Sequence, residues 1–164
     1  MAAPDIVMYE EEFNQIKAVI SKLRVDANAK VVFLVDKNGQ QIAAQGEIEN
    51  LDTTSLASLT AGNVAATDGL ARLIGEKEFT ILFHEGEKDN IHISLVGQRV
   101  ILVVVFDKRT AVGLVRLRVK KSTDNLARIF EDIAAKVERE KEDGKLDESP
   151  FAEITDEDIE NLFK

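Results

Sequence analysis

The run at residues 100–106, VILVVVF, is apolar at every position. A strand with one solvated face alternates apolar and polar residues, so a continuous apolar run predicts a strand that is covered on both faces. Such a strand belongs in the middle of a sheet. The run is much shorter than the roughly 18 apolar residues that a membrane-spanning helix needs. We therefore expect no membrane insertion.

Four further strands are predicted around this central strand. TILFHEG and NIHISLVG alternate with a period of two, and together with residues 100–106 they predict a three-stranded meander. Turns are expected at residues 87–90 and 97–98. Nearer the N-terminus, KVVFLVDKNGQQIAAQG places Asn38-Gly39 between two strand-like runs. This dipeptide favours the positive φ angles of a tight hairpin turn, so an antiparallel strand pair is expected here.

Two amphipathic helices are predicted at the ends of this strand pattern. Residues 9–27 open with three glutamates and repeat apolar residues every three or four positions, which predicts a helix packed on the sheet. From residue 110 the sequence LVRLRVKK alternates like a strand, but an apolar stripe of helical spacing continues to residue 137. The length favours one long helix. Its first half is basic, either as a solvated face or as a docking patch for an acidic partner, through Arg116, Arg118, Lys120 and Lys121.

The segment at residues 51–78 predicts a helix that contains two glycines, which are unfavourable in a helix interior. Helix starts are available at residues 52–55, and Gly75 is the expected stop. A small-residue stripe forms a flat side: Ser58, Gly62, Ala65 and Gly69. A separate stripe is expected to be the core face on the sheet: Leu59, Ala66, Leu70, Leu73 and Ile74. The flat side allows another backbone to approach closely, either a strand of the same domain or a second molecule.

The C-terminal part of the sequence predicts a domain at residues 5–141, a charged linker at 142–150 and a short docking helix at 151–164. A helix this short is marginal in isolation, so it should dock through its apolar residues. It either closes on its own domain as a latch or binds a partner in a groove. The apolar residues are Phe151, Ile154, Ile159, Leu162 and Phe163.

Composition and motifs exclude several classes of function. The net charge of -9 and pI near 4.8 argue against nucleic-acid binding, and the absence of cysteine excludes disulfides and thiolate metal sites. His84 and His92, the two histidines, lie on predicted strands and do not suggest a metal site. No phosphate loop, dinucleotide motif or nucleophile elbow is present, so no cofactor and no intrinsic catalytic activity are expected. The N-terminus lacks signal-peptide features, which suits a cytoplasmic protein.

The order helix, two strands, helix, three strands, helix resembles the roadblock and dynein-light-chain family. The segments that carry the resemblance are MYEEEF at 8–13, KVVFLVDKNGQ at 30–40, DTTSLASLTAGNVAA at 52–66, AVGLVRLR at 111–118 and SPFAEITDEDIENLF at 149–163. It implies an α/β roadblock-type sandwich of order α-β-β-α-β-β-β-α with a five-stranded antiparallel sheet and a short C-terminal helix. It also implies a homodimer whose second helices pair and whose sheets join edge to edge.

The bacterial members that the chain resembles imply a GTPase-activating regulator. Its partner would be a small Ras-like polarity and motility GTPase of the MglA type in its GTP-bound state, and the protein would be enriched at a cell pole. It would reshape the switch loops of the GTPase without an arginine finger, so that Arg72, Arg99, Arg109, Arg116 and Arg118 need not be catalytic. The C-terminal helix would make a further GTPase contact. The dimer and GTPase surface would include Ser58, Ala61, Gly62, Ala65, Gly69 and Arg72.

Two other functions stay open beside that one. A roadblock scaffold would bind a GTPase or another polarity protein without changing hydrolysis, whereas an enzyme in its own right finds no supporting motif. The sequence departs from the family pattern at one position beside the expected flat surface, where Asp68 adds a charge directly before Gly69. This charge could tune the affinity for a partner or the choice of partner.

Overall fold

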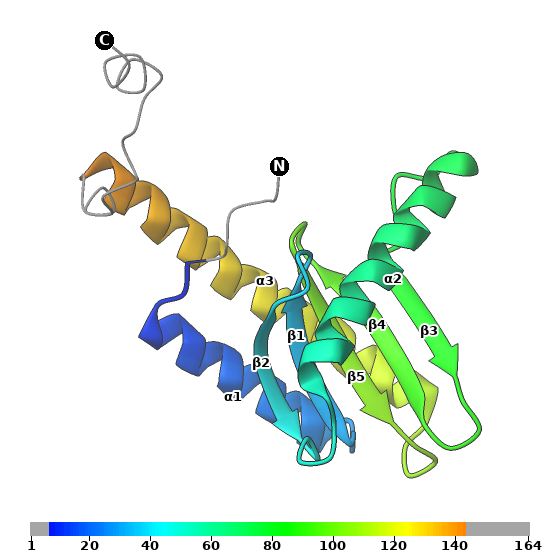
Figure 1. Cartoon of the computed structure of the whole chain (residues 1–164). Helices are drawn as coiled ribbons and strands as arrows, with labels where there is room; N and C mark the ends of the chain where they lie inside the picture. Colours follow the sequence, from blue (N-terminus) through cyan, green and yellow to red (C-terminus); the bar gives the residue numbers. More distant parts are fainter. Residues whose placement is uncertain (1–6, 144–164) are drawn as a thin grey trace. The chain divides into compact units, whose positions relative to one another are not determined.

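The computed structural model describes residues 7–143 of the chain (Figure 1). The predicted element order is confirmed, including the long helix after residue 110 in place of the alternative strand. In chain order the elements are α1 (Glu10–Asp26), β1 (Val31–Asp36), β2 (Gln41–Gly46), α2 (Thr53–Leu73), β3 (Ile81–Glu85), β4 (Asn90–Val96), β5 (Val100–Phe106) and α3 (Val112–Glu142).

The chain divides into two units, and the division falls within α3. Residues 1–129 form the first unit, which contains the sheet, α1, α2 and the first part of α3. Of the second unit, residues 130–164, the structure describes only the end of α3 and one residue beyond it. The predicted linker and docking helix lie outside the described residues, apart from the first two linker positions.

The five strands form one antiparallel sheet in the order β2-β1-β5-β4-β3. The apolar strand β5 is central, as its sequence predicts, and six of its seven residues are buried. Strand β1 is buried along its whole length beside it. The edges of the sheet are β2 and β3, which are only partly buried. The burial pattern therefore follows the position of each strand in the sheet.

The predicted β1–β2 hairpin is present, but its turn is longer than a two-residue turn. The N–H of Asp36 donates to the carbonyl of Gln40 across 2.9 Å, and the N–H of Gly39 donates to the carbonyl of Asp36 across 3.0 Å. Only Gly39 has a positive φ, of 91°, so Asn38 does not adopt the expected conformation. The buried Asp36 carboxylate accepts from the Asn38 and Gln40 N–H groups at 2.9 and 3.0 Å. These bonds stabilise the wider turn.

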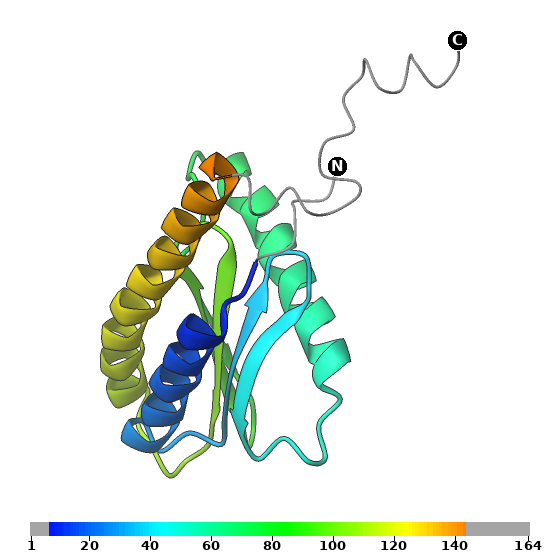
Figure 2. The ribbon, with the colours of Figure 1, turned by 90° about the vertical axis from the view of Figure 1, so that its left-hand side faces the viewer.

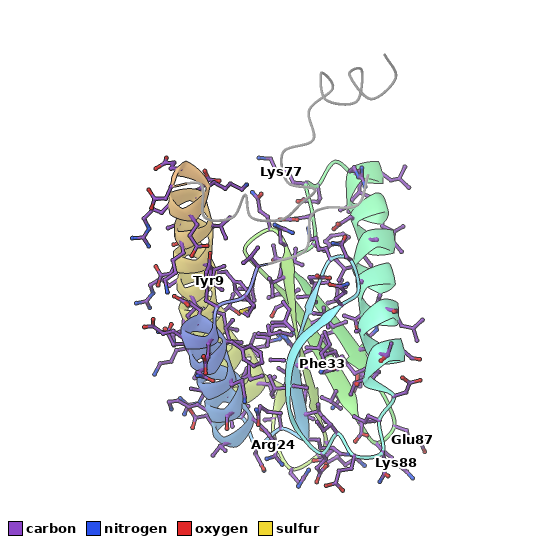
Figure 3. The ribbon with its side chains drawn as sticks, turned by 60° about the vertical axis from the view of Figure 1, so that its left-hand side comes forward. Tyr9, Arg24, Phe33, Lys77, Glu87 and Lys88 are labelled. Carbon is purple, nitrogen blue, oxygen red and sulfur yellow. The ribbon has the colours of Figure 1, made fainter. Side chains whose placement is uncertain are left out.

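Helices cover both faces of the sheet within the first unit. Figure 2 shows α2 on one face and α1 with the first part of α3 on the other. On the α2 side, Phe33 and its neighbours fill the space between helix and sheet (Figure 3). The core on this side consists of Val31, Phe33, Val35, Ala57, Val64, Ile93, Leu95, Ile101 and Val103.

The opposite face of the sheet carries the second layer. Because side chains alternate along a strand, Val32 and Leu34 point away from α2, and both are fully buried. The aromatic rings of Phe83 and Phe106 stack with a centroid distance of 6.2 Å. The predicted apolar stripes of the two helices are buried, through Ile16, Ile20 and Leu23 of α1 and Val115, Val119, Leu126 and Ile129 of α3. This layer closes the core on that side.

Gly46→Ala should destabilise the fold by about 1–3 kcal/mol, because the backbone at this position is closed to a side chain. Gly46 has a φ of 118°, and an added Cβ would lie 2.2 Å from the carbonyl oxygen of Lys30. Urea unfolding at neutral pH would measure the change. Gly113→Ala is the control, because nothing lies within 4 Å of a Cβ built there. Equal stability of Gly46→Ala and the wild type would contradict this backbone geometry.

Candidate protein-binding surface

Helix α2 is capped at both ends by residues that the sequence predicts. The Asp52 carboxylate accepts from the backbone N–H of Ser55 at 3.0 Å and from its hydroxyl at 2.6 Å. After the last turn, Gly75 has a φ of 83°, and the N–H of Glu76 donates back to the carbonyl of Ala71 at 2.8 Å. These bonds satisfy backbone groups that a helix terminus leaves without partners. They fix the length of the helix.

The side of α2 that faces the sheet consists of small residues. Ala57, Thr60, Ala61, Val64 and Ala71 are the buried residues of this helix. Opposite them the sheet supplies large side chains, which leave room for only small ones on the helix. The helix therefore packs on the sheet mainly through its smaller apolar residues, and of its leucines only the half-buried Leu56 joins this core.

The prediction that the larger apolar residues of α2 form its core face is wrong. Leu59 is 71% exposed, Leu70 57%, Leu73 83% and Ile74 69%. Ala66 is exposed as well. The physical reason is the size match described above, because the sheet accepts the alanine side of the helix and turns the leucine side outward.

The small-residue stripe also lies on the surface. Ser58, Gly62 and Ala65 are exposed and Gly69 is half-buried. A Cβ built on Gly62 or Gly69 would meet nothing within 4 Å, so no strand in the described part of the chain lies over either glycine. At the N-terminal end, the hairpin turn approaches the helix, since a Cβ on Gly39 would lie 3.3 Å from the Cα of Ser58.

Two of the six predicted α2 site residues need separate description. Ala61 is only 8% exposed and lies beside the hairpin turn, so it supports the fold and does not reach the surface. Arg72 is exposed, and its Nε donates to the carbonyl of Asp68 at 3.4 Å. The predicted influence of the half-buried Asp68 on partner choice stays a prediction. The five predicted C-terminal contact residues lie outside residues 7–143.

The exposed side of α2 includes a run of residues at helical spacing that is mainly apolar. We call it the outer face of α2 and define it as Leu59, Gly62, Ala65, Ala66, Gly69, Leu70 and Leu73. A surface helix normally turns its polar side to solvent. Apolar clusters that are exposed on one chain are typical of surfaces that bind another protein.

An open sheet edge lies beside this helix. Strand β3 ends the sheet, and its Ile81 side chain is 55% exposed. The amide of Asn63 on α2 and the ring of His84 on β3 are hydrogen-bonded at 2.9 Å, which ties the helix to the edge strand. An edge strand can pair with a strand of another molecule. Helix and edge therefore offer two adjacent elements for association.

The predicted arginines occupy different parts of the molecule. Only Arg72 lies on α2, while Arg116 and Arg118 are on α3, on the other side of the sheet. Arg109 is held by the carboxylate of Asp107 at 2.9 Å, and this pairing raises the pKa of Arg109 and lowers the pKa of Asp107. The described residues thus bring no set of arginines together at the outer face of α2.

The described part of the chain also lacks other kinds of site. Between residues 7 and 143, no group of three or more histidines and carboxylates is arranged to hold a metal ion. None of the helices in that range has the length and apolarity to cross a bilayer.

The Asp52 cap should make stability depend on pH. The hydrogen bond from the Ser55 hydroxyl, then that from its N–H, lowers the pKa of Asp52 below its ordinary value of 3.8. Because the pKa of Asp52 is lower in the folded than in the unfolded chain, its carboxylate stabilises the fold at any pH above the unfolded-state pKa. This contribution is lost as the pH falls through the folded-state pKa. Asp52→Ala should therefore lower the urea midpoint at pH 6, and the difference should shrink toward pH 3. A difference that persists unchanged would contradict this role.

Comparison with known proteins identifies relatives of this chain. The Roadblock/LC7 domain model matches residues 15–106. MglB of Myxococcus xanthus is 65% identical, with 77% of this chain and 96% of that chain covered and a TM-score of 0.74. MglB of Thermus thermophilus, a gliding protein, is 31% identical, with 80% and 99% covered and a TM-score of 0.75. An MglB with a tetrameric arrangement is 30% identical, with the same coverage and a TM-score of 0.76. No curated protein matches the chain.

Proposed function

The chain belongs to the Roadblock/LC7 family and is a close homologue of the MglB proteins, and from this premise we propose that it activates GTP hydrolysis by an MglA-type GTPase. It would act as a homodimer on the GTP-bound form. Proteins of this kind regulate a GTPase and have no active site of their own. The same relationship suggests enrichment at a cell pole, which imaging of a fluorescently tagged copy would test.

The outer face of α2 is the observation that supports this proposal. Its leucines are exposed on a single chain, while the same helix is fixed on the sheet by its alanine side. Burying apolar surface contributes about 25 cal/mol per Å², so a second copy that covers these leucines would gain stability. The open edge of β3 would extend the contact by joining the two sheets.

The small residues of the same face suit a GTPase on the paired helices. Gly62 and Gly69 carry no side chain, and Ala65 carries only a methyl group, so the backbone of a partner could approach closely. Arg72 is the only arginine of α2, and the basic residues at the start of α3, such as Arg116 and Arg118, lie on the opposite side of the sheet. This placement favours a mechanism in which contact reshapes the switch loops and shifts the GTPase toward its active arrangement.

A scaffold that binds the GTPase without changing hydrolysis would use the same surface. The described residues hold no cluster of histidines and carboxylates that could bind a metal ion, and this agrees with either function. A measurement of hydrolysis separates the two.

Leu70→Asp should disrupt the homodimer. Leu70 is 57% exposed in the single chain, and a buried, unpaired carboxylate at an interface costs several kcal/mol. Light scattering coupled to size-exclusion chromatography would give the mass of each species. Leu117→Asp is the matched control, because Leu117 is 63% exposed but lies on α3, and this variant should stay dimeric. A wild-type monomer, or a dimeric Leu70→Asp variant, would contradict the proposed pairing.

Single-turnover GTP hydrolysis by the MglA-type GTPase of the same source should accelerate when the full chain is added. Ala65→Arg and Gly69→Arg should each reduce the acceleration by about tenfold or more, because a large charged side chain would hold the partner away. Ala111→Arg, an exposed change before α3, should have no effect. A version that ends at Ser149 would report whether the C-terminal helix takes part.

The outcomes of this assay are distinct. No acceleration by a chain that still binds the GTP-bound GTPase would favour the scaffold function. Equal loss of acceleration in Ala65→Arg and Ala111→Arg would mean that the outer face of α2 is not the contact.

A further inference from the structure

A cavity of about 410 Å³ lies between α3 and the strands β3 and β4, on the side of the sheet away from α2. Its volume is in the range of about 300–1,000 Å³ that is common for small-molecule sites. The cavity does not include the outer face of α2, and it meets the surface used in the proposed function only at Ile81 on the edge strand β3. It is lined by Thr80, Ile81, His92, Ser94, Leu95, Arg116, Val119, Lys120, Thr123 and Asp124.

Two polar side chains at this cavity are almost completely buried and have no hydrogen-bond partner. His92 is 1% exposed, and neither of its ring nitrogens is hydrogen-bonded. Ser94 is 5% exposed, and its hydroxyl is likewise unpartnered. Thr123 on α3 contributes a second buried hydroxyl without a partner. Buried polar groups are nearly always hydrogen-bonded in folded proteins, so these groups call for a ligand or for water.

The polar groups of β4 follow a regular alternation along the strand. Asn90, His92 and Ser94 alternate with Ile91 and Ile93, as in a strand with one face in water. The polar face is nevertheless covered by α3, and His92 is aligned with Phe83 on one side and Val104 on the other. A core built only for packing would place apolar residues at these positions.

The open side of the cavity carries two positive charges. Arg116 and Lys120 lie one helical turn apart on α3, and both are exposed. Neither makes an ion pair within residues 7–143. One carboxylate, that of Asp124, lies a turn further along. The protein as a whole has a net charge of -9, so this is a local reversal of its charge.

The protonation state of His92 limits which chemical groups of a ligand the cavity could bind. Burial, and then the charge of Arg116, lowers the pKa of His92. The ring is therefore neutral near pH 7, with one nitrogen that donates and one that accepts. Together with the hydroxyls of Ser94 and Thr123, it can donate to ligand oxygens without adding charge. The fixed positive charge comes from Arg116 and Lys120 alone.

We propose that this cavity binds a small organic monocarboxylate, whose carboxylate faces Arg116 and Lys120 and whose hydrocarbon body lies along Ile81. The apolar side chains that line the cavity, such as Ile81 and Val119, call for a hydrocarbon part in the ligand, which an inorganic anion lacks. The Asp124 carboxylate disfavours a doubly charged group such as a phosphate monoester. A single carboxylate also presents two acceptor oxygens to the donors of the cavity.

The proposal is tested by titrating the full-length, isotope-labelled chain with hexanoate and with benzoate, followed by NMR. Saturable shifts of the Ser94 and Thr123 amides and of the His92 ring are expected. Hexanol and inorganic phosphate, added separately, should each bind about tenfold more weakly or not at all, because each lacks one half of the recognised group.

Variants separate this site from nonspecific attraction. Arg116→Ala, a surface change that leaves the core intact, should weaken hexanoate binding by about tenfold, the usual loss for a charged hydrogen bond. Lys121→Ala is the matched control, because Lys121 is exposed on the same helix but does not line this cavity. His92→Phe should fold, since it removes an unpartnered polar group, and it should lose the hexanoate-induced shifts.

Three results would overturn the proposal. One is the absence of saturable shifts with either carboxylate, which would leave a cavity that holds only water. Another is equal affinity for hexanoate and hexanol, and the third is an equal effect of Arg116→Ala and Lys121→Ala.

Discussion

The close packing of α2 on the sheet is the constraint on which the rest of the structure depends. Ala57 and Val64 pack in one core cluster with the larger side chains of the sheet, such as Phe33 and Ile101. Small side chains allow the helix to lie close to the strands. Because this side of the helix must face the sheet, the direction of every other side chain on the helix is set as well. Leu59, Leu70 and Leu73 are consequently outside. The apolar surface that we propose for protein binding thus arises from how the core is filled.

The two layers on the sheet serve different purposes. On one face, α1 and the first part of α3 bury their apolar stripes and complete the core. On the other face, α2 buries its alanine side and leaves an apolar outer face beside the open edge of β3. The buried polar groups of β4 without partners, His92 and Ser94, lie in the first of these layers. The proposed association with proteins and the proposed binding of a small ligand therefore use opposite faces of one sheet.

The sequence was sufficient for the fold but only partly for the site. The central position of β5, the order of elements and the roadblock family are confirmed, because they depend on local periodicity and on long matching segments. Helical spacing identified two stripes on α2, but neither of them faces the sheet. The buried side is a third set of residues, Ala57, Thr60, Ala61, Val64 and Ala71. Which side of the helix is buried depends on the size of side chains from distant strands, such as Phe33 and Ile93. The alternation of polar and apolar residues in β4 is evident from the sequence. The packing of α3 over the polar residues His92 and Ser94 is not.

The central claim is that a second copy of the chain covers the outer face of α2. The chain has no cysteine, so single cysteines can be introduced at Leu70 and at Leu117, which are 57% and 63% exposed in the single chain. The most direct measurement is the alkylation rate of each cysteine in native solution, divided by its rate in the unfolded chain. Strong protection of Leu70→Cys and little protection of Leu117→Cys are expected if a second copy covers the outer face of α2. Similar rates at the two positions would contradict that claim.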